Sequence, residues 1–223
     1  MTMPVLDEVK PRSEICRVAR SLFERGYVHA TAGNISARLA DGFLITPGDA
    51  CLGFLEPADL AKVGVDGVQL SGARASKALA LHRSIYEADP ASACIIHTHS
   101  LSLVALTLCG VWSRSDIVPP ITPYYVMKVG HVPLIDYHRP GDPAVGSLVA
   151  QAIVRAREQG APIRAVMFDR LGPNVWHDSP AAAMAVLEEL EETARLWLNC
   201  NPKPEPLTMA QIDDLRRNFG ASW

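Results

Sequence analysis

The chain lacks long apolar runs, an excess of basic residues and any segment that looks like a linker. No window approaches the roughly 18 consecutive apolar residues of a membrane-spanning helix, and the first residues lack a signal-peptide core, so we expect a cytoplasmic protein. The net charge of −3, with mixed signs, disfavours nucleic-acid binding. With 223 residues, of which 48% are apolar, the chain is long enough to bury a full core.

The cysteines form no pattern typical of a disulfide framework or a metal site. Their number is odd and none belongs to a C-x-x-C pair. We therefore expect reduced thiols that serve mostly as packing residues. They are Cys16, Cys51, Cys94, Cys109 and Cys200.

Apolar periodicity and turn dipeptides predict a layered α/β domain. Helical spacing of apolar residues predicts helices over 12–25, 76–88, 143–158, 180–198 and 207–219. Alternating or short apolar runs predict strands over 34–40 and 43–46, a second hairpin over 63–70, and strands over 93–96, 132–135 and 165–168. The sum is a central sheet, largely built from hairpins, with helices around it.

Two histidines one residue apart end the apolar run Ala93–Ile96. Because side chains alternate along a strand, His97 and His99 are expected to point the same way. Two neutral imidazoles on one side of a strand end form half of a divalent-metal site. The other histidines stand singly, and for these we expect structural or surface roles: His29, His82, His131, His138 and His177.

Three turns are rich in glycine and in hydroxyl or amide side chains. They lie at residues 31–36 (TAGNIS), at 46–48 (TPG), and at 71–77, where Ser71-Gly72 is followed by Ser76-Lys77. Backbone N–H groups in such turns can hold a phosphate, and the third turn opens a helix whose dipole favours an anion. Each turn alone is typical of an ordinary loop. Together with the histidine pair they favour a phosphorylated ligand.

Longer motifs give the chain a family resemblance. They are TAGNIS at 31–36, ITPG at 45–48, the helix with His82 and Tyr86, HTHS at 97–100, Gly172-Pro173 and the helix beginning near 180. With these motifs the chain resembles the class II aldolase/adducin family, the zinc-dependent sugar-phosphate aldolases typified by L-fuculose-1-phosphate aldolase. The runs at 122–131, 133–141, 188–194 and 206–208, with Ser76-Lys77, are closer to its branch of 3-oxo-tetronate 4-phosphate decarboxylases.

The resemblance implies a fold and an assembly. The fold is a three-layer α/β arrangement with a nine-stranded, mostly antiparallel sheet flanked by helices, in one domain over residues 1–223. The assembly is a ring-shaped homotetramer with active sites at subunit interfaces. The expected partner is a small phosphorylated sugar acid, with no membrane or nucleic acid involved.

The resemblance also implies a mechanism and its residues. A divalent ion, Zn²⁺ or else Mn²⁺ or Fe²⁺, is held by three histidines and stabilises the enediolate left by bond cleavage, while a glutamate moves the proton. His97 and His99 match two of these ligands. The phosphate-contacting or substrate-contacting positions are Thr31, Gly33, Asn34, Ser36, Gly48, Ser76 and Lys77. The catalytic positions are Tyr124 or Tyr125, near a family tyrosine that helps proton transfer, and Lys77.

Two positions depart from the family pattern. The catalytic glutamate directly follows the Ser-Lys pair, and Ala78 stands there; the third histidine ligand immediately precedes Gly-Pro, and Leu171 stands there. Neither side chain can bind a metal or give a proton. Asp169, which would share strand parity with Leu171, and His177 are the candidate replacement ligands.

Three functions remain open at this point. The first is a metal-dependent lyase of the decarboxylase type, which gives dihydroxyacetone phosphate and carbon dioxide. The second is a diverged member that binds a metabolite, with weak or no turnover, or serves as a structural partner as adducin-like heads do. The third is another reaction on the same scaffold. Decarboxylation needs an electron sink and a later protonation but no base, so the loss of the glutamate should harm it less than an aldol cleavage.

Overall fold

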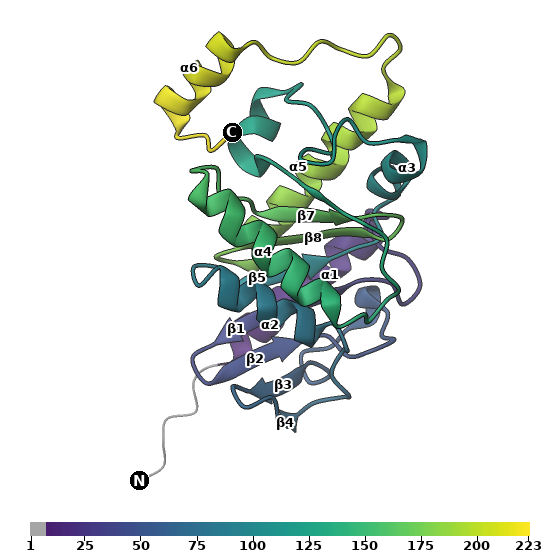
Figure 1. Cartoon of the computed structure of the whole chain (residues 1–223). Coiled ribbons are helices and arrows are strands. Elements are labelled where there is room, and N and C mark those ends of the chain that lie inside the picture. Colours follow the sequence, from purple (N-terminus) through teal and green to yellow (C-terminus); the bar gives the residue numbers. More distant parts are fainter. Residues whose placement is uncertain (1–7) are drawn as a thin grey trace.

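A central sheet of eight strands organises the computed structural model, which describes residues 8–223 (Figure 1). The strand order is β4-β3-β2-β1-β5-β8-β7-β6. The strands are β1 (Asn34–Leu39), β2 (Gly42–Ile45), β3 (Ala61–Gly64), β4 (Gln69–Ser71), β5 (Cys94–His97), β6 (Leu134–Ile135), β7 (Ala165–Phe168) and β8 (Gly172–His177). Within these residues β6 and β7 run parallel and all other neighbours run antiparallel. The mostly antiparallel sheet is confirmed, with eight strands instead of nine.

Helices cover both faces of this sheet (Figure 1). They are α1 (Val9–Glu24), α2 (Leu79–Ala88), α3 (Leu101–Cys109), α4 (Ala144–Glu158), α5 (Pro180–Asn199) and α6 (Met209–Phe219), with a short 3-10 helix, η1 (Leu52–Phe54), and a short π-helix, η2 (Tyr125–Val129). The five helices and the strands expected from the sequence are present, with ends shifted by a few residues. No helix within residues 8–223 is long and apolar enough to span a membrane.

Two apolar clusters fill the space between the sheet and its helices. One joins α1, α3 and α5 to the sheet, and the other joins α2 and α4 to its opposite face. Ile96 of β5 lies in the first cluster and Ile95 in the second, so this strand is buried on both faces. Burying a side chain of this size contributes about 1.5–3 kcal/mol, which explains the continuous apolar run before His97. The three-layer arrangement is confirmed, and all five cysteines are free thiols.

Two elements lay outside the expectations from sequence. β8 begins with Gly172-Pro173, which is typical of a turn, and α3 is apolar on all sides and so shows no helical periodicity. Both matter for the site, because β8 pairs with β5 and α3 follows directly after the histidine pair.

The entry into β8 is held by a close backbone approach at Gly172. This residue has a φ of +140°, and a Cβ added there would lie 1.9 Å from the carbonyl oxygen of Thr98, between the two histidines. Only glycine allows the β7–β8 turn to approach the end of β5 so closely.

We expect Gly172→Ala to lower the free energy of unfolding by about 3 kcal/mol or more, because the clash is with backbone and cannot be relieved by a rotamer change. Gly160→Ala is the matched control: φ is +75° there and nothing lies within 4 Å of the added Cβ. Its cost should be about 1–2 kcal/mol, from the left-handed backbone alone. Urea denaturation of both variants measures the difference, and equal costs would contradict the role given to the Thr98 contact.

Candidate functional site

Three polar side chains lie in a row across the middle of the sheet. Asn34 of β1 pairs in register with His97 of β5, and His97 pairs with Asn174 of β8. Directly opposed residues on neighbouring strands share a face. Since Trp176, two residues after Asn174, packs in the cluster under α2 and α4, the row faces that layer.

Two contacts with β8 fix the orientation of the His97 ring. Its Nδ1–H donates to the carbonyl oxygen of Pro173 at 2.8 Å, and the Asn174 amide lies 3.3 Å from the same nitrogen. This tautomer leaves Nε2 with a free lone pair. Burial, with a smaller contribution from neighbouring His99, lowers the pKa of His97 to about 4. The ring is therefore neutral at pH 7.

His99 lies just beyond the end of β5. Its ring centre is 5.0 Å from that of His97 and 6.5 Å from that of His29. Two imidazoles on one tetrahedral zinc, with Zn–N distances of about 2.0–2.1 Å, have ring centres roughly 5 Å apart. Partial burial, and then His29, lower the pKa of His99. The structure thus brings His97 and His99 together, and it adds an exposed His29 beside them.

A hydrogen-bonded chain joins α2 to β1 next to this row. The Oγ of Ser36 lies 2.7 Å from Nδ1 of His82 and 2.8 Å from the hydroxyl of Tyr86. His82 is fully buried, and burial together with nearby His97 lowers its pKa to about 3. Sequence reasoning gave His82 only a structural or surface role. The available signal was that His82 and Tyr86 are four residues apart and so share one helix face.

The three glycine-rich turns converge at one end of the row. The backbone N–H of Ser76 donates to Thr46, and the Oγ1 of Thr46 accepts from the N–H of Ile35, next to Asn34. Gly48 joins the same turn through a hydrogen bond to Arg74. The structure therefore places Asn34, Gly48 and Ser76 on neighbouring segments.

The remaining predicted phosphate positions differ in exposure. Thr31 and Lys77 are exposed, whereas Ser36 is fully buried beneath His82. Gly33, with a φ of +85°, lets the loop pass so close to β5 that an added Cβ would lie 2.8 Å from the carbonyl oxygen of His97.

The two predicted catalytic tyrosines lie at the start of η2, which packs against α5. Tyr125 is fully buried and its hydroxyl lies 3.5 Å from the carbonyl oxygen of Val118; burial raises its pKa well above the ordinary value. Tyr124 is 60% exposed.

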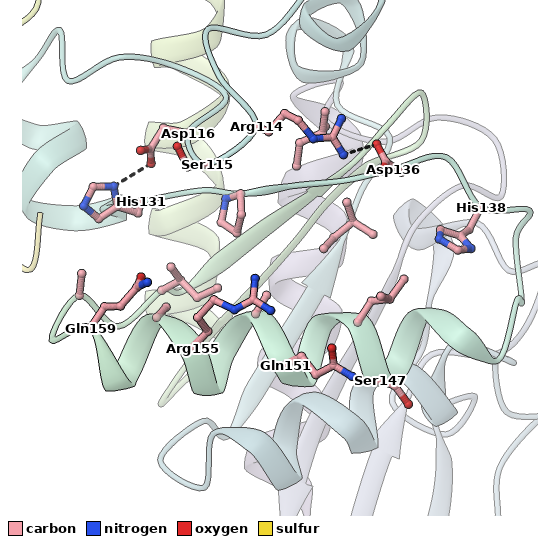
Figure 2. A pocket seen from close by; sticks show the side chains of 18 of the residues that line it. Arg114, Ser115, Asp116, His131, Asp136, His138, Ser147, Gln151, Arg155 and Gln159 are labelled. Carbon is pink, nitrogen blue, oxygen red and sulfur yellow. Dashed lines mark hydrogen bonds and ion pairs between the residues drawn. The ribbon is translucent and has the colours of Figure 1, made fainter.

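A separate cavity of about 1070 Å³ lies between β6 and α4 (Figure 2). Two pairs form part of its polar wall, with Arg114 bound to Asp136 and His131 bound to Asp116. It shares no lining residue with the row of Asn34, His97 and Asn174.

The three-histidine metal set implied by the resemblance does not fit this chain. His97 and His99 supply two ligands, but Leu171 packs into the apolar cluster under α2 and α4. Ala78 is the N-cap of α2, one turn before His82, and offers no carboxylate. Among residues 8–223 no three His, Cys, Asp or Glu side chains are placed to hold a metal ion.

The two proposed replacement ligands lie elsewhere. His177 pairs with Cys94, at the opposite end of β5 from His97, and its ring binds Asp178. Asp169 lies in the β7–β8 turn, beside Arg170, whose φ is +60°. The expected shared parity of Asp169 and Leu171 is wrong, because the chain turns between them and does not continue as a strand.

A family model, curated relatives and solved structures all match this chain over most of its length. Residues 13–198 match the family Class II Aldolase and Adducin N-terminal domain. The chain is 53% identical over 221 residues to the 3-oxo-tetronate 4-phosphate decarboxylase of Cupriavidus necator, covering 97% of this chain and 99% of that protein. The crystal structure of YgbL from Klebsiella pneumoniae matches with a TM-score of 0.83 at 38% identity, covering 95% and 100% of the two chains. The L-fuculose-1-phosphate aldolase of Thermus thermophilus matches with a TM-score of 0.71 at 25% identity, covering 85% and 93%.

Because His82 and His97 are buried with lowered pKa values, we expect the free energy of unfolding to depend on pH. The folded chain protonates His97 only near pH 4 and His82 only near pH 3, against 6.5 for the unperturbed ring, so the unfolded state binds more protons in between. The free energy of unfolding should therefore fall as the pH drops from about 6.5 toward 4, by up to about 1.4 kcal/mol per pH unit for each ring. Urea denaturation at several pH values measures this slope. His97→Gln should flatten it, while His177→Gln should not; an unchanged slope in His97→Gln would contradict the assignment.

We expect the replacement of Leu171 by histidine to increase the affinity of the chain for Zn²⁺. Leu171→His should bind Zn²⁺ at least about tenfold more tightly than the wild type, because it adds an imidazole beside His97 and His99. Isothermal titration with Zn²⁺ measures this, and Leu148→His, on the surface of α4, is the control. Equal affinity of Leu171→His and the wild type would show that position 171 does not reach the pair.

Proposed function

The chain belongs to the class II aldolase and adducin family, and from that premise we propose that it is a carbon–carbon lyase that decarboxylates 3-oxo-tetronate 4-phosphate. The observation that carries the proposal is the meeting of the three glycine-rich turns beside the neutral His97. Such a site offers an anchor for a phosphate next to groups that can act on the sugar-acid end of the same molecule. The near full-length similarity to a protein with this activity supports the same reaction.

The reaction makes modest demands on the protein. The bond between the carboxylate carbon and C2 breaks, its electron pair forms the C2–C3 double bond, and the C3 carbonyl oxygen becomes an enolate as carbon dioxide leaves. A proton then adds at C2 to give dihydroxyacetone phosphate. No base removes a proton before the bond breaks, so Ala78 in place of a glutamate is compatible with this chemistry.

The phosphate is bound at the start of α2. The Ser76 hydroxyl, the Asn34 amide and the helix dipole favour an anion there, while the N–H groups of Gly48 and Ser76 already donate to the carbonyl oxygens of Arg74 and Thr46. Lys77 is exposed at the mouth of this turn, so its ammonium group adds a charge that salt screens in part.

The family depends on a divalent metal, which stabilises an enediolate when bound. His97 and His99 would hold two of its coordination positions, and imidazole ligands suit Zn²⁺ better than Mn²⁺. Position 171 supplies no third ligand, so we assign no step of the reaction to the metal.

Proton delivery at C2 is assigned to Tyr124 in preference to Tyr125. Tyr125 is sealed in the core, whereas Tyr124 is exposed on the surface and so is open to a ligand held by a neighbouring subunit. This assignment accords with a homotetramer whose active sites lie between subunits. The free cysteines accord with a reducing cytoplasm.

The purified enzyme should release carbon dioxide and dihydroxyacetone phosphate from 3-oxo-tetronate 4-phosphate. Lys77→Ala should raise KM about tenfold with kcat little changed, because a partly screened phosphate contact contributes roughly 1.4 kcal/mol to binding. Lys10→Ala, on the exposed side of α1, is the control. A coupled assay for each product measures both parameters. No turnover by the wild type, together with turnover by the Ala78→Glu, Leu171→His double variant, would rule out native activity on this substrate.

A further inference from the structure

The cavity between β6 and α4 is the largest feature of the structure that the proposed reaction does not use (Figure 2). Its volume is about 1070 Å³. Pockets that hold drug-sized ligands have about 300–1,000 Å³, and the sugar-acid phosphate of the proposed reaction is smaller than such ligands. The cavity therefore has room for a different and longer molecule.

The helix α4 lines one wall of this cavity with two stripes of side chains. In each stripe successive residues are four positions apart, so they lie on one face of the helix. One stripe is apolar and the other polar, and they include Leu148, Ala152 and Ala156 and, respectively, Gln151, Arg155 and Gln159. From Leu148 to Gln159 the helix rises by about 16 Å, so an elongated molecule that lies along α4 contacts both stripes.

The opposite wall adds aliphatic surface. Leu134 and Ile135 of β6, with Pro133 before them, line the cavity there. Among the described residues that line it, the only rings other than proline are the imidazoles of His131 and His138, which bind Asp116 and Asp142. The cavity thus offers no aromatic side chain on which a nucleobase stacks, and its apolar area suits an alkyl chain.

Arg155 gives this cavity a positive charge that no other side chain balances. On the opposite wall Arg114 binds Asp136, and the carboxylate of Asp116 accepts from His131 and from the backbone N–H of Val132. The Arg155 side chain has no ion pair or hydrogen bond among residues 8–223, and it extends from α4 toward that wall (Figure 2). A guanidinium group binds a carboxylate through two parallel hydrogen bonds, so its charge favours an anionic head group.

We propose that the cavity binds a long-chain aliphatic carboxylate, with the carboxylate at Arg155 and the alkyl chain between α4 and β6. The amides of Gln151 and Gln159, one turn on either side of Arg155, donate to the same head group. The alkyl chain covers Leu148 and Ala152 on one side and Ile135 on the other, and each methylene group removed from water adds to the affinity. This site is separate from the histidine row, so its occupancy does not depend on the proposed reaction.

The test compares decanoate with decanol, which have alkyl chains of equal length and differ in the charge of the head group. Titration calorimetry on the full chain measures the affinity for each probe. Arg155→Gln removes the charge from the cavity, and Leu148→Glu places a charge in its apolar stripe. Arg217→Gln, exposed on α6 as Arg155 is on α4, is the matched control.

The wild type should bind decanoate at least about tenfold more tightly than decanol, because the guanidinium binds only the anion. Arg155→Gln should weaken decanoate binding about tenfold and change decanol binding less than about twofold. Leu148→Glu should weaken both by about tenfold or more, and Arg217→Gln neither.

Unchanged decanoate affinity in Arg155→Gln would overturn the proposal, since the carboxylate would then lie elsewhere. Equal affinity of the wild type for the two probes would overturn it too. The same holds if the wild type binds neither probe, as when a second copy of the chain covers the cavity.

Discussion

The hydrogen bond from Nδ1 of His97 to the carbonyl oxygen of Pro173 holds the site together. The same carbonyl accepts from the backbone N–H of Thr98, so β5 and β8 are joined at the point where the histidine pair begins. That contact requires the close approach at Gly172, and it fixes both the tautomer and the direction of the His97 ring. The position of Asn174 beside the ring follows from the same register.

A second constraint is the burial of two neutral imidazoles beside this bond. His97 and His82 are buried and stay neutral, because burial disfavours their protonated forms. Ala78 and Leu171 remove the acid and the imidazole that the family pattern would place nearby. The layer therefore holds neutral imidazoles and apolar side chains, together with two charged groups: Arg38, which stacks over the Tyr86 ring, and Asp89, which accepts from Nε1 of Trp176.

Much of this arrangement could be predicted from the sequence, and the reasons are local. The Asp41-Gly42 turn, the alternation along 34–40 and the apolar run before His97 each depend on neighbouring residues, and the structure has the corresponding elements. The glycine-rich turns were recognisable from their composition, but their meeting beside Asn34 depends on sheet order. β8 escaped prediction because it begins with Gly-Pro, and α3 because it is apolar all round. The partnership of Asn174 with His97 spans 77 residues and has no local signal.

The buried polar atoms beside His97 are the least satisfied part of this layer. Oδ1 of Asn34, Oδ1 of Asn174 and Nε2 of His82 are sealed from solvent and have no hydrogen-bond partner among residues 8–223. An unsatisfied buried polar group costs about 1–3 kcal/mol, so these three side chains lower the stability of the fold. The hydrogen bonds from His97 to Pro173 and between Ser36 and His82 offset part of this cost, because they satisfy the other polar atoms of the same layer.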